Sequence, residues 1–126
     1  MPPGGRFIMT LSEFEEIVER ALRGVPRRFR DILEREGIPV LARNRVPRAL
    51  REKDRVLFGL FVGVPYTERS VFDLEMEPTR IELYRESFEE MFADRAEMEA
   101  EIVKTVIHEI GHYFGFSEPE LERRGL

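Results

Sequence analysis

The hydrophobic pattern at the start of the chain is that of two short helices. Apolar residues recur at three- and four-residue spacing in the segment 14–22, as on one face of a helix. Thr10 and Glu13 before them make a capping-box sequence, and Gly24 follows as a stop. A second helix is expected over residues 26–36, because a proline suits its first turn and a glycine follows its last. The pattern therefore predicts a helical hairpin.

The middle of the chain contains three stretches with strand character. Residues 38–43 are short and rich in apolar side chains, and their proline confines them to a sheet edge or a strand start. Residues 56–62 are apolar on both faces, which is consistent with a central strand, although the pattern of so short an apolar run does not distinguish a strand from a helix. Residues 79–85 alternate charged with apolar side chains, the period of a half-buried strand. Residues 71–77 are a weaker candidate, and the polar, basic segment 44–54 is expected to be a loop.

The last third of the chain is predicted to be helical. Ser87 can cap a short helix, and Asp94 can cap a long one that runs to Phe114. Ser117 and Glu120 are spaced as a capping box for a final short helix. At about 100° per residue, the apolar side chains of the long helix cluster on one side. This expected core stripe consists of Val103, Val106, Ile107, Ile110 and Phe114.

Length and composition predict one domain. A chain of 126 residues with 42% hydrophobic residues can bury a core and is too short for two ordinary domains. Residues 1–9 are expected to form a flexible N-terminal arm, and they lack the apolar run and cleavage site of a secretory signal. The longest apolar stretch, 56–64, is about half the length of a membrane span. We therefore expect a soluble, cytoplasmic protein.

Charge is unevenly distributed along the chain. The net charge is −5, yet residues 20–55 contain twelve basic and five acidic side chains. This segment lacks aromatic stacking repeats and any recognisable module, so we interpret it as a solvated face and not as a nucleic-acid surface. The chain has one asparagine and no glutamine or cysteine, which suits a thermophile or merely a GC-rich genome. Without cysteine, any metal must be held by nitrogen and oxygen ligands.

The clearest chemical signal is the segment 108–118, HEIGHYFGFSE, which has the pattern HExxHxxGxxE and holds both histidines of the chain. Residues four apart on a helix share a face, so His108 and His112 can bind one cation. Glu109 lies beside them, where a carboxylate can act as general base on a metal-activated water. Both histidines and Glu109 fall about opposite the expected core stripe, so they should face a cleft or solvent. The alternative is two surface histidines that happen to be four apart.

Glu118 is the candidate for the third protein ligand. Gly115 permits a positive φ, so the chain can turn back after the helix and return a side chain toward the histidines. A competing interpretation makes Glu118 a first-turn acid that the dipole of the last helix favours, with Glu122 or a water as the replacement ligand. Tyr113 is interpreted as a packing residue and not as an oxyanion donor.

Taken together, these segments resemble the zincin superfamily, and more narrowly the small, single-domain bacterial zincin-like metallopeptidases. The similarity covers the helical N-terminal segment and residues 57–69, 78–85 and 105–118. The family motif is HExxHxxGxxD, so Glu118 stands where an aspartate is usual. The resemblance implies an α+β fold, with a small mixed sheet packed against a long active-site helix and additional helices around them.

The function implied by this resemblance is zinc-dependent hydrolysis of peptide bonds. One Zn²⁺ would be held by His108, His112 and Glu118, with Glu109 as the base and a peptide or protein as the substrate; neither nucleic acid nor a membrane is an expected partner. By analogy with larger zincins, residues 79–85 are the candidate edge strand beside the substrate. The alternative is a non-catalytic metal-binding or protein-interaction domain that keeps the fold. The same ligand types also suit iron, cobalt or nickel.

Overall fold

The computed structural model describes residues 9–63 and 79–124, which form a three-stranded mixed sheet and five α-helices. The α+β class and the small mixed sheet against a long helix are confirmed. In chain order the elements are α1 (Leu11–Arg23), α2 (Arg27–Arg35), β1 (Val40–Arg43), the 3-10 turn η2 (Arg48–Leu50), β2 (Gly59–Val62), β3 (Arg80–Tyr84), α3 (Arg85–Met91), α4 (Arg95–Tyr113) and α5 (Glu118–Arg123). The weak strand candidate 71–77 lies outside the described residues.

The N-terminal helical hairpin forms where the sequence predicts it. Thr10 Oγ1 accepts a hydrogen bond from the Glu13 N–H at 3.1 Å, and Glu13 Oε1 accepts one from the Thr10 N–H at 3.1 Å. This reciprocal capping box satisfies two backbone donors that the first turn of a helix leaves without partners. Helix α1 ends at Gly24, and α2 is followed by Gly37 with a positive φ of 67°. Local signals therefore placed both helices.

The strand order is β1-β3-β2, with β1 parallel and β2 antiparallel to β3. The edge position expected for residues 38–43 is confirmed in β1. The prediction of a central strand over 56–62 was wrong, because β2 lies at an edge of the described sheet and β3 lies in the middle. The apolar side chains of that segment are covered by helices instead: Phe58 packs on Phe88 at 4.9 Å between ring centroids, and Phe61 on Tyr113 at 5.7 Å.

The central strand β3 is buried on both faces, so the half-buried interpretation of its alternating pattern was also wrong. Glu82 is only 6% exposed. Its carboxylate accepts hydrogen bonds from Arg80 Nε at 2.5 Å and from the Tyr84 hydroxyl at 3.2 Å. Burial, followed by the neighbouring Glu82 carboxylate, raises the pKa of Tyr84 to about 12, so the phenol stays a donor. The alternating residues Arg80, Glu82 and Tyr84 therefore form a hydrogen-bonded row of polar side chains on one face of the sheet, and this face is not exposed to solvent.

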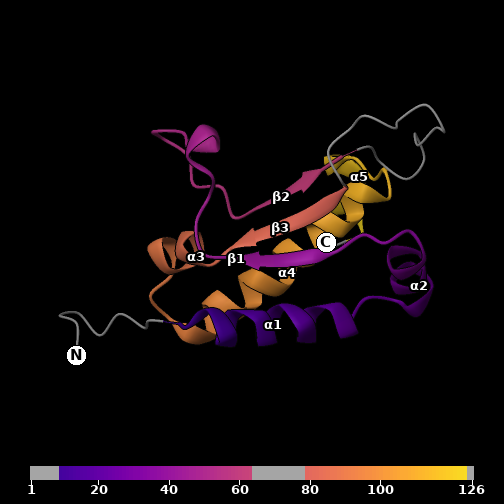
Figure 1. Cartoon of the computed structure of the whole chain (residues 1–126), viewed down its shortest axis with the longest axis horizontal. Coiled ribbons are helices and arrows are strands. Elements are labelled where there is room, and N and C mark those ends of the chain that lie inside the picture. Colours follow the sequence, from indigo (N-terminus) through magenta and orange to yellow (C-terminus); the bar gives the residue numbers. More distant parts are fainter. Residues whose placement is uncertain (1–8, 64–78, 125–126) are drawn as a thin grey trace.

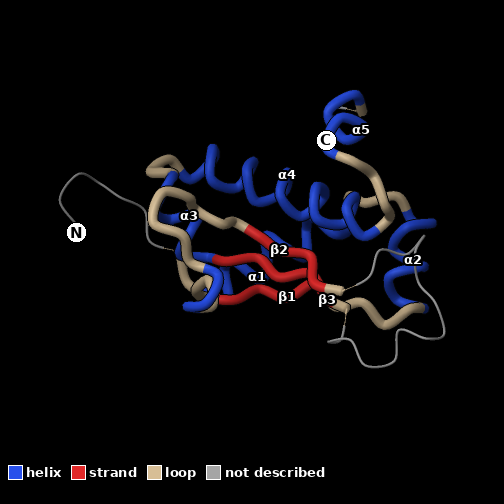
Figure 2. The backbone as a smooth tube through the Cα atoms, turned by 90° about the horizontal axis from the view of Figure 1, so that it is seen from above, coloured by secondary structure: helices blue, strands red, loops and turns tan. Residues whose placement is uncertain are grey.

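Helices α1 and α4 lie side by side on one face of the sheet, which gives the molecule two layers (Figures 1 and 2). The core lies between these layers. The fully buried side chains of α4 are not the ones expected from the sequence. Helix α4 contacts α1, β2 and β3, and the side of the helix that faces these three elements is the buried one. Of the expected residues Val103, Ile107 and Phe114 are only half-buried. The buried apolar side chains are Met98, Ile102, Val106, Ile110 and Tyr113.

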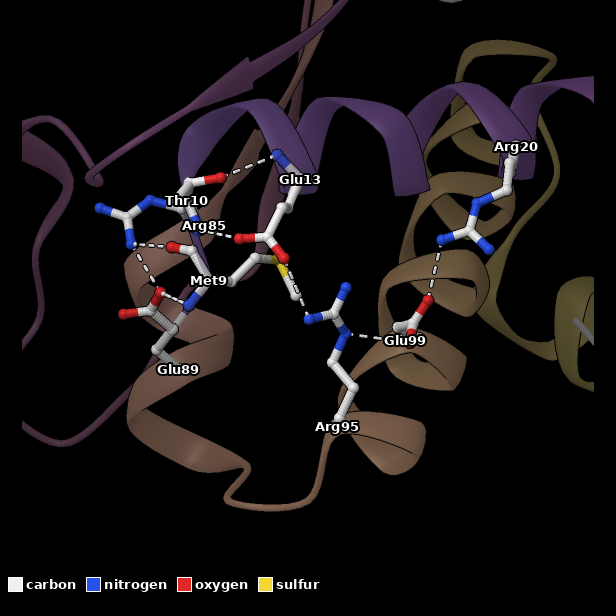
Figure 3. Close-up of polar contacts among 8 residues, drawn as sticks. All are labelled: Met9, Thr10, Glu13, Arg20, Arg85, Glu89, Arg95 and Glu99. Carbon is white, nitrogen blue, oxygen red and sulfur yellow. Dashed lines mark hydrogen bonds and ion pairs between the residues drawn. The ribbon is translucent and has the colours of Figure 1, made fainter. Parts of the chain in front are cut away.

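Met9 belongs to the core and not to a flexible arm, which corrects the prediction at that residue; residues 1–8 lie outside the described residues. Its side chain packs into the hydrophobic cluster and the residue is 1% exposed. Its N–H donates to Glu89 Oε1 at 2.9 Å, and its carbonyl accepts from Arg85 Nη1 at 2.8 Å. The same guanidinium also donates to Glu89 at 2.6 Å (Figure 3). Its Nε donates to Asn44 Oδ1 at 3.0 Å. Arg85 thus fixes the start of α1.

Replacing Arg85 with alanine should lower the free energy of unfolding by about 2 kcal/mol, because it leaves the Met9 carbonyl without this donor and a mostly buried carboxylate without its cationic partner. The guanidinium side chain is 16% exposed and that of Glu89 17%. Urea unfolding at constant m-value measures the change. The matched control is Arg27→Ala, whose side chain is 86% exposed and lies 4.0 Å from Asp31. It should stay within about 0.5 kcal/mol of the wild type; equal effects of the two changes would contradict the assignment.

A second ionic cluster joins the two long helices at the surface. Arg95 on α4 contacts Glu13 of α1 at 3.2 Å and Glu99 at 3.1 Å, and Glu99 also accepts from Arg20 of α1 at 2.9 Å (Figure 3). The partners are partly exposed, so the cluster adds orientation more than free energy.

None of the described helices combines the length and apolar composition that crossing a bilayer requires.

Candidate metal centre

Helix α4 presents both histidines near its C-terminal end. It begins at Asp94, whose Oδ2 accepts from the Glu97 N–H at 2.9 Å, and continues for 19 residues. His108 and His112 are one helical turn apart, with ring centroids 4.8 Å apart and edges turned toward faces. Both rings direct Nε2 to one place, since each Nε2 lies 2.8 Å from the same oxygen, Glu118 Oε1. The spacing predicted from the sequence therefore does bring the two imidazoles together.

Glu118 reaches this place from the next helix. The chain reverses at Gly115, where φ is +87°, a conformation that glycine adopts without steric cost. Ser117 then caps α5, with Glu120 completing the capping box, and Glu118 is the first residue of that helix. Glu118 is thus a first-turn acid of α5 whose carboxylate also faces the histidines, and its role as the third ligand stays a prediction. The hydrogen bond from His108 is the main cause of the lowered pKa of its carboxyl.

The three side chains fit a zinc ion. One atom from each of His108, His112 and Glu118 lies within 4.8 Å of the others, and no further group of this kind occurs among the described residues. A cation bound to all three would be about 2.0–2.2 Å from each donor, which this spacing allows. The set of two nitrogens and one carboxylate is common in catalytic zinc sites that leave one position open. Glu122, the alternative ligand, is not part of the group.

Glu109 lies beside the ligands without joining them. Its carboxyl is half-buried between α4 and β2. Burial is the main influence and raises its pKa, whereas His112, His108 and a hydrogen bond from the backbone of Phe61 act in the opposite direction. A carboxylate whose pKa is raised toward neutrality is a better proton acceptor than an exposed one. Its position agrees with a base that acts next to the metal and does not bind it.

Strand β2 borders the site because Gly59 permits close packing. A Cβ at Gly59 would lie 2.9 Å from Leu83 Cδ1 and 3.2 Å from Thr105 Cγ2 on α4. Beside this contact is a hollow of about 250 Å³ that reaches the metal-binding face. It is lined by residues 56–59 of the chain and by Glu101, Lys104, Thr105, His108 and Glu109 of α4. The floor of the site therefore comes from upstream segments.

The analogy that assigned the substrate-side strand to residues 79–85 was wrong. Strand β3 pairs on both sides, with β1 and with β2, so its backbone groups are already used. The strand next to the motif helix is β2. The carbonyl of Phe58, the residue before β2, accepts from the Tyr84 N–H at 2.9 Å. Because backbone groups alternate along an antiparallel strand, Leu60 and Val62 also turn theirs to β3 and Phe61 turns its own to the other side.

The tyrosines give no further site residue among those described. Tyr113 is fully buried against Phe61, as the packing interpretation expects. Tyr84 is buried on the sheet, with its hydroxyl on Glu82, and Tyr66 lies outside the described residues.

Two supporting residues were missed by the sequence patterns. They are Gly59 and Gly111, the latter inside α4, where Leu121 packs against it. A glycine within a helix lowers stability by about 1 kcal/mol relative to alanine. The presence of Gly111 inside a predicted helix could therefore have indicated a close packing contact at this position.

Comparison with known families and proteins gave one match. A family model described as zincin-like metallopeptidase matches residues 36–126, which is well over half of the chain and includes β1 to α5 and the whole motif. No curated protein matches the chain.

Proposed function

The chain belongs to the zincin-like metallopeptidase family, and from this premise we propose that it hydrolyses peptide bonds with one zinc ion held by His108, His112 and Glu118. The observation that supports this most directly is the convergence of three donor atoms on one place, each histidine Nε2 being 2.8 Å from the carboxylate oxygen. A zinc ion held by these residues would supply Lewis acidity, for a carbonyl group and for water, whose pKa such an ion lowers to about 7.

The carboxylate of Glu109 is the proton carrier in this proposal. It accepts a proton from the attacking water as the water oxygen bonds to the carbonyl carbon of the substrate. It then gives that proton to the amide nitrogen as the carbon–nitrogen bond breaks, so one residue serves both steps. Its position supports this role, because it lies outside the ligand group and faces β2 across the hollow beside α4.

An extended peptide is the substrate that suits the neighbouring strand. In the part of the chain that the structure describes, β2 pairs only with β3, on one side. Gly59 and Phe61 turn their backbone groups to the other side, and of these groups the Phe61 N–H is already bonded to Glu109. Addition of a substrate strand along such an edge fixes the backbone of the peptide by main-chain hydrogen bonds. The scissile bond would then lie across the histidine pair.

The second candidate is a metal-binding or interaction domain without catalysis. The side chain of Glu118 is 64% exposed, which supports this candidate. A carboxylate that is so open to water can hold a metal in a shallow structural site as well as in a catalytic cleft. Metal analysis of the purified protein, followed by mass spectrometry of a generic peptide library, separates the two. We expect one equivalent of zinc and cleavage that EDTA abolishes. A fully zinc-loaded protein that leaves the library intact would favour the interaction domain.

A further inference from the structure

Helix α5 is attached to α4 by one buried side chain. Leu121 is 0% exposed, and its side chain occupies the space over Gly111 that a Cβ would take, since a Cβ there would lie 2.4 Å from Leu121 Cδ2. The other residues of α5 are exposed or half-buried. Gly111 is the residue before His112, so this contact lies within the motif itself.

Apart from the contacts of Glu118 with the histidines, the other contacts printed for this end of the chain among the described residues fix where α5 begins and not its tilt against α4. The Phe116 N–H donates to the Gly111 carbonyl at 3.0 Å, which closes the turn after α4. The capping box of Ser117 and Glu120 is internal to the α5 segment. Arg124 lies over the Phe116 ring at 4.6 Å, which is again a contact within the same end of the chain.

Leu121 and Glu118 are three residues apart on α5, so they lie on the same side of that helix, one turn apart. That side faces α4, where Leu121 contacts Gly111 and Glu118 contacts both histidines. The apolar contact is buried and the carboxylate is exposed, so water competes for the carboxylate and not for the leucine. A movement of α5 away from α4 by about 1 Å would lengthen the 2.8 Å contacts of this oxygen beyond hydrogen-bond distance.

We propose that Leu121 is a positioning residue for the metal site: by filling the gap over Gly111 it holds α5 in the orientation that presents Glu118 to the cation. This inference rests on the proposed metal site and not on peptidase activity. Residues that orient a ligand typically change metal affinity by about 10–100-fold when they are removed.

Leu121→Ala tests the proposal in the full chain. We expect it to weaken zinc binding by about 10–100-fold in a competition titration with a chromophoric chelator. With Co²⁺ in place of zinc, its visible absorption should change in intensity and position, because one carboxylate is lost or replaced by water. Leu121→Met should restore both values, since methionine fills a similar volume.

The matched control is Leu33→Ala, which removes another buried leucine from α2, away from the ligands. It should lower the unfolding temperature of the metal-free protein and leave zinc affinity and the Co²⁺ spectrum as in the wild type. If Leu121→Ala behaves in the same way, its role is only structural and the proposal is overturned. If that variant does not fold, Leu121→Val provides the same comparison with a smaller shift. A wild type that binds no zinc would instead overturn the metal site, and this inference with it.

Discussion

Replacing Glu109 with glutamine should leave one equivalent of zinc bound and lower the rate of peptide hydrolysis by about 10²–10⁴-fold, the contribution of a positioned general base. Glutamine has nearly the same size and can still accept the hydrogen bond from Phe61 through its carbonyl, but it cannot take a proton from water. Zinc should remain because Glu109 is not among the three converging ligands. Single-turnover cleavage of a library-derived peptide, with metal analysis of the same sample, measures both quantities.

The control for this change is Glu97→Gln, an exposed carboxyl in the first turn of the same helix. It should retain full activity and full zinc content. The base assignment is wrong if Glu109→Gln cleaves peptides at the wild-type rate. Loss of zinc in that variant would instead place Glu109 among the ligands.

Replacing His112 with alanine should lower zinc affinity by more than about 100-fold, because it removes one of the three proposed ligand atoms. Residues that only orient a ligand typically contribute up to about 100-fold. The wild type should gain about 2.7 kcal/mol of stability at a free zinc concentration 100 times its Kd. This gain should vanish in the variant at the same zinc concentration. Thermal unfolding with and without EDTA measures it: the wild type should unfold at a lower temperature in EDTA, and the variant at one temperature in both buffers.

Comparison of the two metal-free proteins is the internal control for this experiment. His112 is partly exposed and its contact with Glu118 involves a carboxylate open to water, so the metal-free variant should unfold close to the metal-free wild type. Undiminished zinc content in the variant would remove His112 from the site.

Local sequence signals located most of the helices and brought the histidines together, but the expected cap Ser87 was wrong, since α3 begins at Arg85 and contains Ser87. Thr10 and Glu13 located the start of α1, and Asp94 that of α4, because a cap needs only neighbours along the chain. The four-residue spacing of the histidines was informative for the same reason, since helix geometry alone brings them together. Gly115 adopts the positive φ that was expected of it.

Strand order was not predictable in this way, because pairing depends on residues far apart in sequence. The segment 56–62 is apolar on both sides because Phe58 and Phe61 pack on helices, and the same pattern would arise in a central strand. Glu82 made β3 look half-exposed, although Arg80 and Tyr84 satisfy its carboxylate inside the protein. Alternation of polar and apolar residues along a strand shows which side chains are polar, but it does not show which of them are exposed to solvent.

The role of Glu118 was also beyond a local reading. The sequence offered a helix start or a metal ligand as alternatives, and in the structure the helix start itself faces the histidines, because α5 begins where the chain has turned back over α4. That return depends on Leu121 meeting Gly111, a contact between residues ten apart whose volumes fit only after both helices have formed.

The three proposed ligands stand on two helices, which would determine which parts of the molecule a bound ion stabilises. The histidines stand on a long helix that packs on α1 and the sheet, so their separation is fixed before any ion arrives and costs no ordering entropy. Glu118 is separated from His112 by five residues, a loop whose closure is entropically cheap. A bound ion would therefore act as a cross-link between α4 and the end of the chain. Its stabilising effect should be concentrated in α5, the segment whose amide hydrogens would exchange first when the ion leaves.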